Sequence, residues 1–165
     1  MKTTEHIARH IIEVFEGGNW TDVNMKDTLS NINYKEATSV TKASYNTIAA
    51  LVYHISFYNE IILQRLQGIN PIINSANGFD LPPIRNENDW LQIKQRCFQS
   101  AHDLAAAVIK LPEEKLDELT VTGHSTHYKS LHGVAEHAHY HLGQIVLLKK
   151  LVKNHVSHYA MSNSL

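Results

Sequence analysis

A length of 165 residues, with 43% hydrophobic and 19% charged side chains, fits one globular domain and excludes a disordered chain. The formal net charge of −1 at pH 7 excludes nucleic-acid binding through a basic surface, and no apolar run approaches the roughly 18 residues that a membrane span needs. The single cysteine, Cys97, excludes an internal disulfide, and the N-terminus lacks the pattern of a signal peptide. We therefore expect a soluble, cytoplasmic protein with neither nucleic acid nor membrane as a partner.

The first half of the chain predicts two long helices separated by a connector. The first helix is expected at about residues 3–16, where apolar residues recur every three or four positions and two consecutive glycines follow. The connector carries Leu29 and Ile32, which we expect to pack against the core. The second helix is expected at about residues 42–66. It is followed by a long loop at 70–86 that is rich in Asn, Pro and Gly.

The second half predicts two further long helices. The third is expected from Asn88 or Asp89 to about Lys110, where Pro112 ends it. The fourth is expected from residue 125 or 126 to about Lys153, followed by a loose tail at 153–165. No run of alternating strands is present. The sequence therefore predicts an all-α protein, a single domain over residues 1–165, built as a four-helix bundle.

Twelve histidines are the unusual feature of the composition, and the fourth helix carries two pairs of them. At 100° per residue, His137 and His141 lie on one face of this helix together with Ile145, whereas His132 and His139 lie on the opposite face. We expect the first pair to face the core and the second pair to face water. Two imidazoles at positions i and i+4 can reach one metal ion, although the same spacing also occurs on packed or solvated helix faces.

A third ligand is available on the second helix. His54 lies in the middle of an apolar stripe there, and an imidazole inside a bundle needs a partner for each ring nitrogen. A metal ion shared with His137 and His141 would satisfy it, and ordinary core packing is the alternative. His102 on the third helix ranks below His54, because it lies off the apolar stripe of that helix.

Three histidines leave one coordination position open, which is typical of catalytic rather than structural zinc-type sites. A bound metal lowers the pKa of a water in that position towards neutrality and so creates a nucleophile. The catalytic residues are unknown, with two candidates. Gln144, one turn beyond His141, is a candidate for orienting a water or substrate, and Tyr58, one turn beyond His54, for touching a substrate. The alternatives are an edge position for Gln144 and core packing for Tyr58, and Glu60 is expected to miss the site.

The remaining reactive or aromatic side chains favour packing over chemistry. Cys97 follows the apolar stripe of the third helix, which predicts a small buried hydrophobe and not a nucleophile. Trp20, Trp90 and Phe98 are interpreted as core anchors.

Two segments, IAALVYHISFYNEIILQRLQG at 48–68 and LHGVAEHAHYHLGQIVLLKKL at 131–151, resemble the DinB/YfiT-like superfamily of metalloenzymes. The stretch GGNWTDVNMKDTLSNI is similar to the first connector of that family. The resemblance implies a four-helix bundle, often a homodimer, with a divalent metal held by a histidine triad. Carried over to the matching positions, the triad is His54, His137 and His141. One departure is Leu142, where relatives often have Arg, and it weakens any inference about an anionic substrate.

Two function classes follow. Better-understood relatives are thiol-dependent transferases or isomerases, so the resemblance implies a metal-dependent enzyme. Such an enzyme would activate a water for hydrolysis or a low-molecular-weight thiol for transfer, and its partner would be a small-molecule substrate or thiol cosubstrate. The alternative is a non-catalytic metal-binding or stress-linked interaction module, which a fourth protein ligand would favour. The expected cofactor is one divalent metal ion, zinc or nickel first and iron or manganese as alternatives.

Overall fold

The computed structural model describes the backbone of residues 1–162 and the side chains of residues 1–154. This part of the chain is all-helical and contains no β-strand, which confirms the predicted class. Its four long helices are α1 (Thr3–Glu16), α4 (Ile48–Leu66), α5 (Glu87–Lys110) and α6 (His127–Ser162). The shorter elements are α2 (Met25–Leu29), α3 (Tyr34–Thr38) and the 3-10 helix η1 (Glu113–Lys115).

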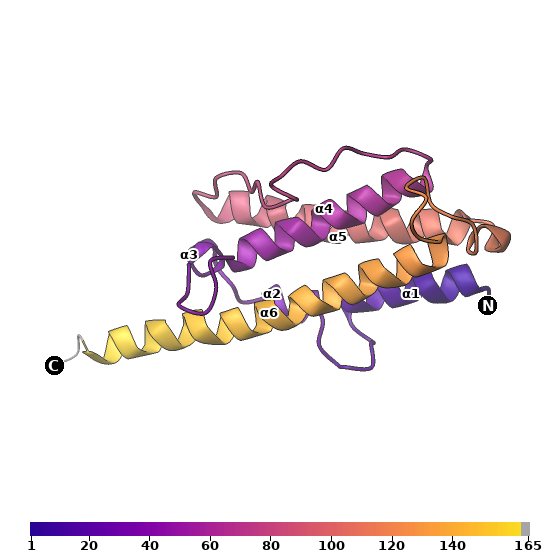
Figure 1. Ribbon diagram of the computed structural model, residues 1–165. Helices are drawn as coiled ribbons and strands as arrows, with labels where there is room; N and C mark the ends of the chain where they lie inside the picture. Colours follow the sequence, from indigo (N-terminus) through magenta and orange to yellow (C-terminus); the bar gives the residue numbers. More distant parts are fainter. Residues whose placement is uncertain (163–165) are drawn as a thin grey trace.

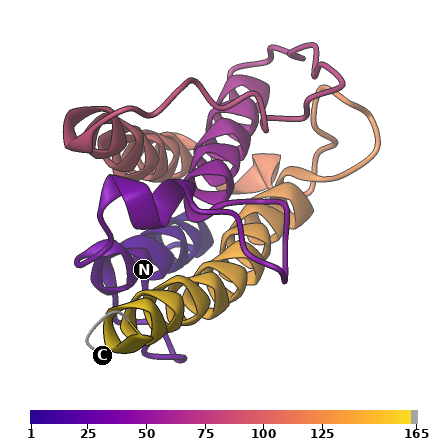
Figure 2. The ribbon, with the colours of Figure 1, turned by 90° about the vertical axis from the view of Figure 1, so that its left-hand side faces the viewer.

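The four long helices pack around one core. Each contacts two of the others: α4 packs on α5 and α6, and α1 packs on the same two helices. Helices α4 and α5 run in one direction, and α1 and α6 run in the other (Figure 1). Because α4 and α5 are parallel neighbours, the loop 67–86 between them must return along their whole length. Figure 2 shows α6 lying beside both α1 and α4.

Helix boundaries follow local capping. Helix α1 spans the predicted range. Helix α4 begins later than predicted, because the hydroxyl of Thr47 accepts a hydrogen bond from the Ala50 N–H at 3.2 Å and so caps the helix there. Helix α6 continues to Ser162, past the predicted end at Lys153, and no glycine or proline interrupts residues 144–162. The last three residues of the predicted tail, 163–165, lie outside the described residues.

The connector between α1 and α4 is held by a tryptophan of α5. Trp90 is fully buried, and its indole N–H donates to the Ile32 carbonyl at 2.8 Å. Leu29 and Ile32 are both buried in the same core, as predicted. Phe98 packs against this core and is partly buried. Among the described residues, no helix is long and apolar enough to cross a membrane.

Trp20 corrects the sequence prediction, because it is 97% exposed and anchors nothing in the core. The reason is the turn that contains it. The buried side-chain amide of Asn19 donates to the carbonyls of Glu13 and Val23, both at 2.8 Å, and its oxygen accepts from Thr21 N–H at 3.0 Å. Asn19 therefore occupies the inner side of the turn, and the next residue points outward.

Candidate metal centre

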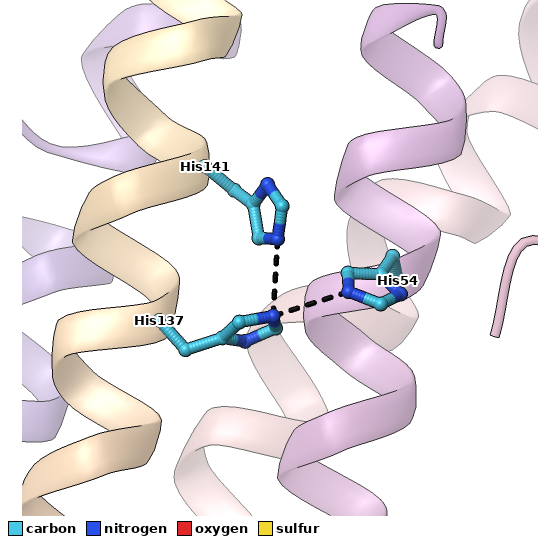
Figure 3. A group of neighbouring side chains, drawn as sticks. All are labelled: His54, His137 and His141. Atoms are coloured by element: carbon cyan, nitrogen blue, oxygen red, sulfur yellow. Dashed lines mark hydrogen bonds between the residues drawn. The ribbon is translucent and has the colours of Figure 1, made fainter. Parts of the chain in front are cut away.

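Two neighbouring helices bring three histidines together. His54 comes from the middle of α4, and His137 and His141 lie one turn apart on α6 (Figure 3). Because α4 and α6 are in contact, the two helices present these rings to one another. One ligand nitrogen from each histidine lies within 4.8 Å of the others. His54 and His141 are buried and His137 is half-buried.

The nitrogens that converge are all Nε2. The Nε2 atom of His137 lies 3.1 Å from that of His54 and 3.0 Å from that of His141. Three imidazole nitrogens around a tetrahedral zinc-type ion, at the usual bond length, are separated by about 3.3 Å. Two of the three separations are close to this value, and all three ligand atoms lie within 4.8 Å of one another, so the group could hold a single divalent ion.

Neighbouring oxygens fix the tautomer of the two outer rings. The Nδ1–H of His54 donates to the Asn77 carbonyl at 2.9 Å, and the Nδ1–H of His141 donates to the Gln144 side-chain oxygen at 2.7 Å. Since a neutral imidazole carries one proton, both Nε2 atoms hold lone pairs. Two acceptors therefore point at the Nε2 atom of His137.

His137 cannot satisfy both acceptors. If its proton is on Nε2, the N–H bond can point at only one of the two lone pairs. If the proton is on Nδ1, three lone pairs face each other. The Nδ1 atom of His137 is itself buried without a hydrogen-bond partner among the described residues. A cation at the centre would accept the lone pairs of all three Nε2 atoms at once, which is the chemistry of a metal site.

The environment keeps these rings neutral. Burial lowers the pKa of His137 to about 4, helped by the proximity of His141 and His54. Burial is also the main cause that lowers the pKa of His54 and of His141. Metal ligation requires the unprotonated imidazole, so the three histidines are in the ligating form at neutral pH.

The loop 67–86 covers one side of the triad. Phe79 stacks on the ring of His54, with ring centroids 4.1 Å apart, and the Asn77 carbonyl orients the same ring. Asn77 has φ +51° and Gly78 has φ +74°, so the chain makes a tight left-handed turn at this point. Sequence reasoning missed these three residues. The Asn-Gly pair signals a turn, but nothing in it shows that the turn folds onto a helix far away in sequence.

The two residues suggested as catalytic candidates both lie at the site. Gln144 accepts from His141 and donates to the Tyr140 hydroxyl at 3.2 Å, so its amide orients a ligand ring. Tyr58 lies with its ring centroid 5.0 Å from that of His54 and 4.8 Å from that of His137. Its hydroxyl donates to the side-chain oxygen of Asn77 at 2.6 Å. The structure thus gives both residues a positioning contact.

Other candidates lie elsewhere. His102 pairs with Glu16 at 2.8 Å on the surface. Glu60 pairs with Arg96 at 2.6 Å and misses the triad, as predicted. Cys97 is fully buried, and burial raises the pKa of its thiol to about 12, so it is not a resting nucleophile.

The second histidine pair of α6 only partly follows the prediction that it faces water. His132 and His139 are both half-buried, and His139 stacks on His10 of α1 with ring centroids 5.8 Å apart. The deepest positions of α6 include Leu131, Ala138 and Ile145. Helix α6 lies between α4 and α1, so the positions on both sides of this buried stripe are also covered. The side next to α4 carries His137 and His141, and the side next to α1 carries His139.

A cleft of about 390 Å³ opens beside the triad. It is lined from α4 by His54, Tyr58, Ile62 and Arg65, from α6 by Ser130, Gly133, Val134 and His137, and from the loop by Asn77. This volume is in the range of small-molecule sites. A larger cavity of about 790 Å³ lies along α2 and α5 but contains no triad residue, so we assign the site to the smaller cleft on chemical grounds.

No family model, curated protein or solved structure matches this chain.

Proposed function

We propose that this protein is a divalent-metal-binding protein of the DinB-like, four-helix-bundle type that activates a water or a low-molecular-weight thiol. The observation that carries the proposal is the convergence of three Nε2 atoms, two of which are fixed as lone-pair donors by Asn77 and Gln144. The sequence resemblance of the segments around His54 and His137 supports the same assignment. The homodimer that the resemblance implies belongs to this proposal and is tested by size-exclusion chromatography with light scattering.

When bound, a divalent ion supplies a Lewis acid that lowers the pKa of a coordinated water or thiol towards neutrality. The protein supplies the rest. Asn77 and Gln144 hold the outer rings in the ligating tautomer, and Phe79 shields one face of His54 from water. The cleft lets a small molecule reach His54 and His137 from the other side.

An open coordination position favours catalysis over a sealed binding module. Among the described residues, the cluster of potential ligands contains three histidines and no carboxylate or thiolate. A fourth histidine, cysteine or carboxylate ligand is therefore absent from the described part of the chain, and the cleft reaches two of the three histidines. Both features are typical of catalytic rather than structural zinc-type sites.

Elemental analysis of tag-free protein tests the metal. We expect close to one divalent ion per chain in the wild type and none in the His54→Ala/His137→Ala/His141→Ala variant. A His102→Ala/His132→Ala variant is the control, because it removes two histidines that do not belong to the triad. Circular dichroism establishes that each variant is folded. Wild-type protein that neither contains nor takes up zinc, nickel, iron or manganese overturns the proposal.

Spectroscopy distinguishes activation of a water from activation of a thiol. Cobalt-loaded protein is titrated with 2-mercaptoethanol, and a new thiolate-to-metal charge-transfer band shows that a thiol enters the open position. We then expect thiol transfer to a chromogenic electrophile such as 1-chloro-2,4-dinitrobenzene. Without that band, hydrolysis of activated esters is the activity to measure. If the metal-loaded protein catalyses neither reaction, the non-catalytic alternative is favoured.

A further inference from the structure

The far end of the cleft carries a cation. Arg65 lies eleven residues after His54 on α4, which is three turns along the helix and on the same face, at about 16 Å along the axis. Side chains of a helix lean towards its N-terminus, so the Arg65 side chain leans back towards His54. On the antiparallel helix α6, Ser130 occupies the same end of the cleft.

Arg65 has no partner in the described part of the protein. Its Nε atom is buried without a hydrogen bond, and it belongs to none of the ion pairs among these residues. Arg96 shows the ordinary arrangement, because it makes two hydrogen bonds to Glu60 and lies over the ring of Tyr53. A buried guanidinium nitrogen without an acceptor is costly, and each such group in a folded protein needs an explanation.

The rest of the cleft does not neutralise Arg65. Its polar lining is Tyr58, Asn77, Ser130 and two of the triad histidines, none of which is acidic, and the remaining walls are mainly apolar. The cleft thus has a cation at one end, apolar walls and a metal-ligating cluster. Guanidinium presents a planar fork of donors that matches a carboxylate through two hydrogen bonds.

We propose that the cleft binds a small carboxylate-bearing molecule, with the carboxylate on Arg65 and the reacting end at His54 and His137. Only the identity of the reacting end rests on the proposed metal function. The anion site stands on the unpaired guanidinium and on the absence of acidic residues in the cleft lining.

The test uses hexanoate and its neutral isostere hexanamide as probes. Binding to the full chain is measured by NMR titration, both in zinc-loaded and in metal-free protein. We expect hexanoate to bind at least tenfold more tightly than hexanamide in both forms. Arg65→Met should remove this preference, and Arg65→Lys should retain part of it. Arg9→Met is the matched control, since Arg9 is an exposed arginine on α1.

Several outcomes overturn the anion site. Equal binding of hexanoate and hexanamide does so, as does an Arg65→Met variant that binds hexanoate like the wild type. Binding that needs zinc and is insensitive to Arg65 would place the carboxylate on the metal instead. Failure of the metal proposal gives a different result, because a protein that binds no metal would still bind hexanoate more tightly than hexanamide through Arg65. Unchanged chemical shifts elsewhere in the Arg65 variants show that the fold is intact.

Discussion

At the scale of single residues, the site depends on where protons lie. His54 and His141 each have one oxygen acceptor at Nδ1, and this contact turns their Nε2 lone pairs inward. If the triad holds a metal ion as proposed, residues that are not ligands would therefore control its affinity. Outer hydrogen-bond partners of ligating histidines typically contribute about ten- to hundredfold in metal affinity.

Gln144→Leu tests this control directly. The substitution removes the acceptor of the His141 Nδ1–H and leaves that donor without a partner, so the ring loses its fixed tautomer and orientation. We expect zinc affinity to fall about ten- to hundredfold, as measured by competition with a chromophoric chelator. Gln144→Glu, which keeps an acceptor at this position, should restore most of it.

Gln99→Leu is the control for this measurement. Gln99 also bonds a neighbour on its own helix, Asp103 at 2.8 Å, but it is exposed and remote from the triad. Zinc affinity that is the same in Gln144→Leu and in wild type would show that the Gln144 contact has no part in ligand orientation.

The pKa values of the triad predict an acid-sensitive apoprotein. The pKa of His137 is lowered from 6.5 to about 4 by burial, and those of His54 and His141 are also lowered. Between pH 6.5 and about 4, the unfolded chain binds a proton at His137 that the folded chain does not, and the lowered pKa values of His54 and His141 act in the same direction. The contribution of these rings to the free energy of unfolding is thus fully present above pH 6.5. It is lost as the pH decreases through this window.

Urea denaturation of metal-free protein at pH 7 and pH 5 measures the effect. Each fully shielded histidine contributes up to about 1.4 kcal/mol per pH unit, and half-buried rings contribute less. Wild-type protein should therefore lose more stability over this interval than the His54→Ala/His137→Ala/His141→Ala variant, which lacks the three groups. Equal losses in the two proteins would contradict the shifted pKa values.

At the scale of elements, the loop 67–86 completes the site that α4 and α6 form. It orients His54 through Asn77 and covers it with Phe79, and Gly78 lies between the two. A side chain at Gly78 would be impossible without rearrangement, since a Cβ atom there would lie 2.5 Å from a ring carbon of Phe57. The left-handed backbone at Gly78 adds a second reason for glycine.

Gly78→Ala should therefore lower both stability and metal affinity. We expect a loss of about 1–3 kcal/mol in the free energy of unfolding, from the clash and the strained φ, measured on the metal-free protein. Displacement of Asn77 and Phe79 should also weaken zinc binding, measured by chelator competition.

The variant Gly68→Ala separates the effect of backbone strain from the effect of a steric clash. Gly68 also has a positive φ, of +82°, but a Cβ atom added there would have no neighbour within 4 Å. This variant should lose some stability and keep wild-type zinc affinity. A Gly78→Ala protein with wild-type zinc affinity would show that the loop does not hold His54 in place.

The elements differ in how far sequence predicts them. Periodicity and caps place α1 and α5 well, because those signals are local. A helical projection at 100° per residue predicts that His54, His137 and His141 face inward, because the direction of each side chain depends only on its position in its own helix. The same projection wrongly predicts that His139 faces water, because α6 packs against a helix on each side. The outward side chain of Trp20 depends on the hydrogen bonds of Asn19, which a hydrophobicity pattern does not contain.

At the scale of the whole molecule, topology sets the dimensions of the cleft. Because α4 and α6 contact each other and run in opposite directions, the C-terminal end of α4 meets the N-terminal part of α6 (Figure 1). Arg65 and Ser130 therefore share one end, and His54 and His137 share the other. No single helix contains the site, and the resemblance of short segments predicts the triad but not the Arg65 end.

If the proposed metal site and the proposed carboxylate site hold the two ends of one ligand, their fixed separation selects ligands by length. Mercaptocarboxylates of the form HS–(CH2)n–COO⁻ can place sulfur at the metal and carboxylate at Arg65 only when the chain spans the cleft. A linker that is too short cannot make the second contact, and one that is too long dilutes its effective concentration. In zinc-loaded protein, affinity should therefore pass through a maximum as n increases. Arg65→Met should flatten this dependence while leaving the affinity for 2-mercaptoethanol unchanged. Affinities that rise steadily with n in both proteins would indicate simple apolar burial along the walls, and the two ends would then not act on one ligand.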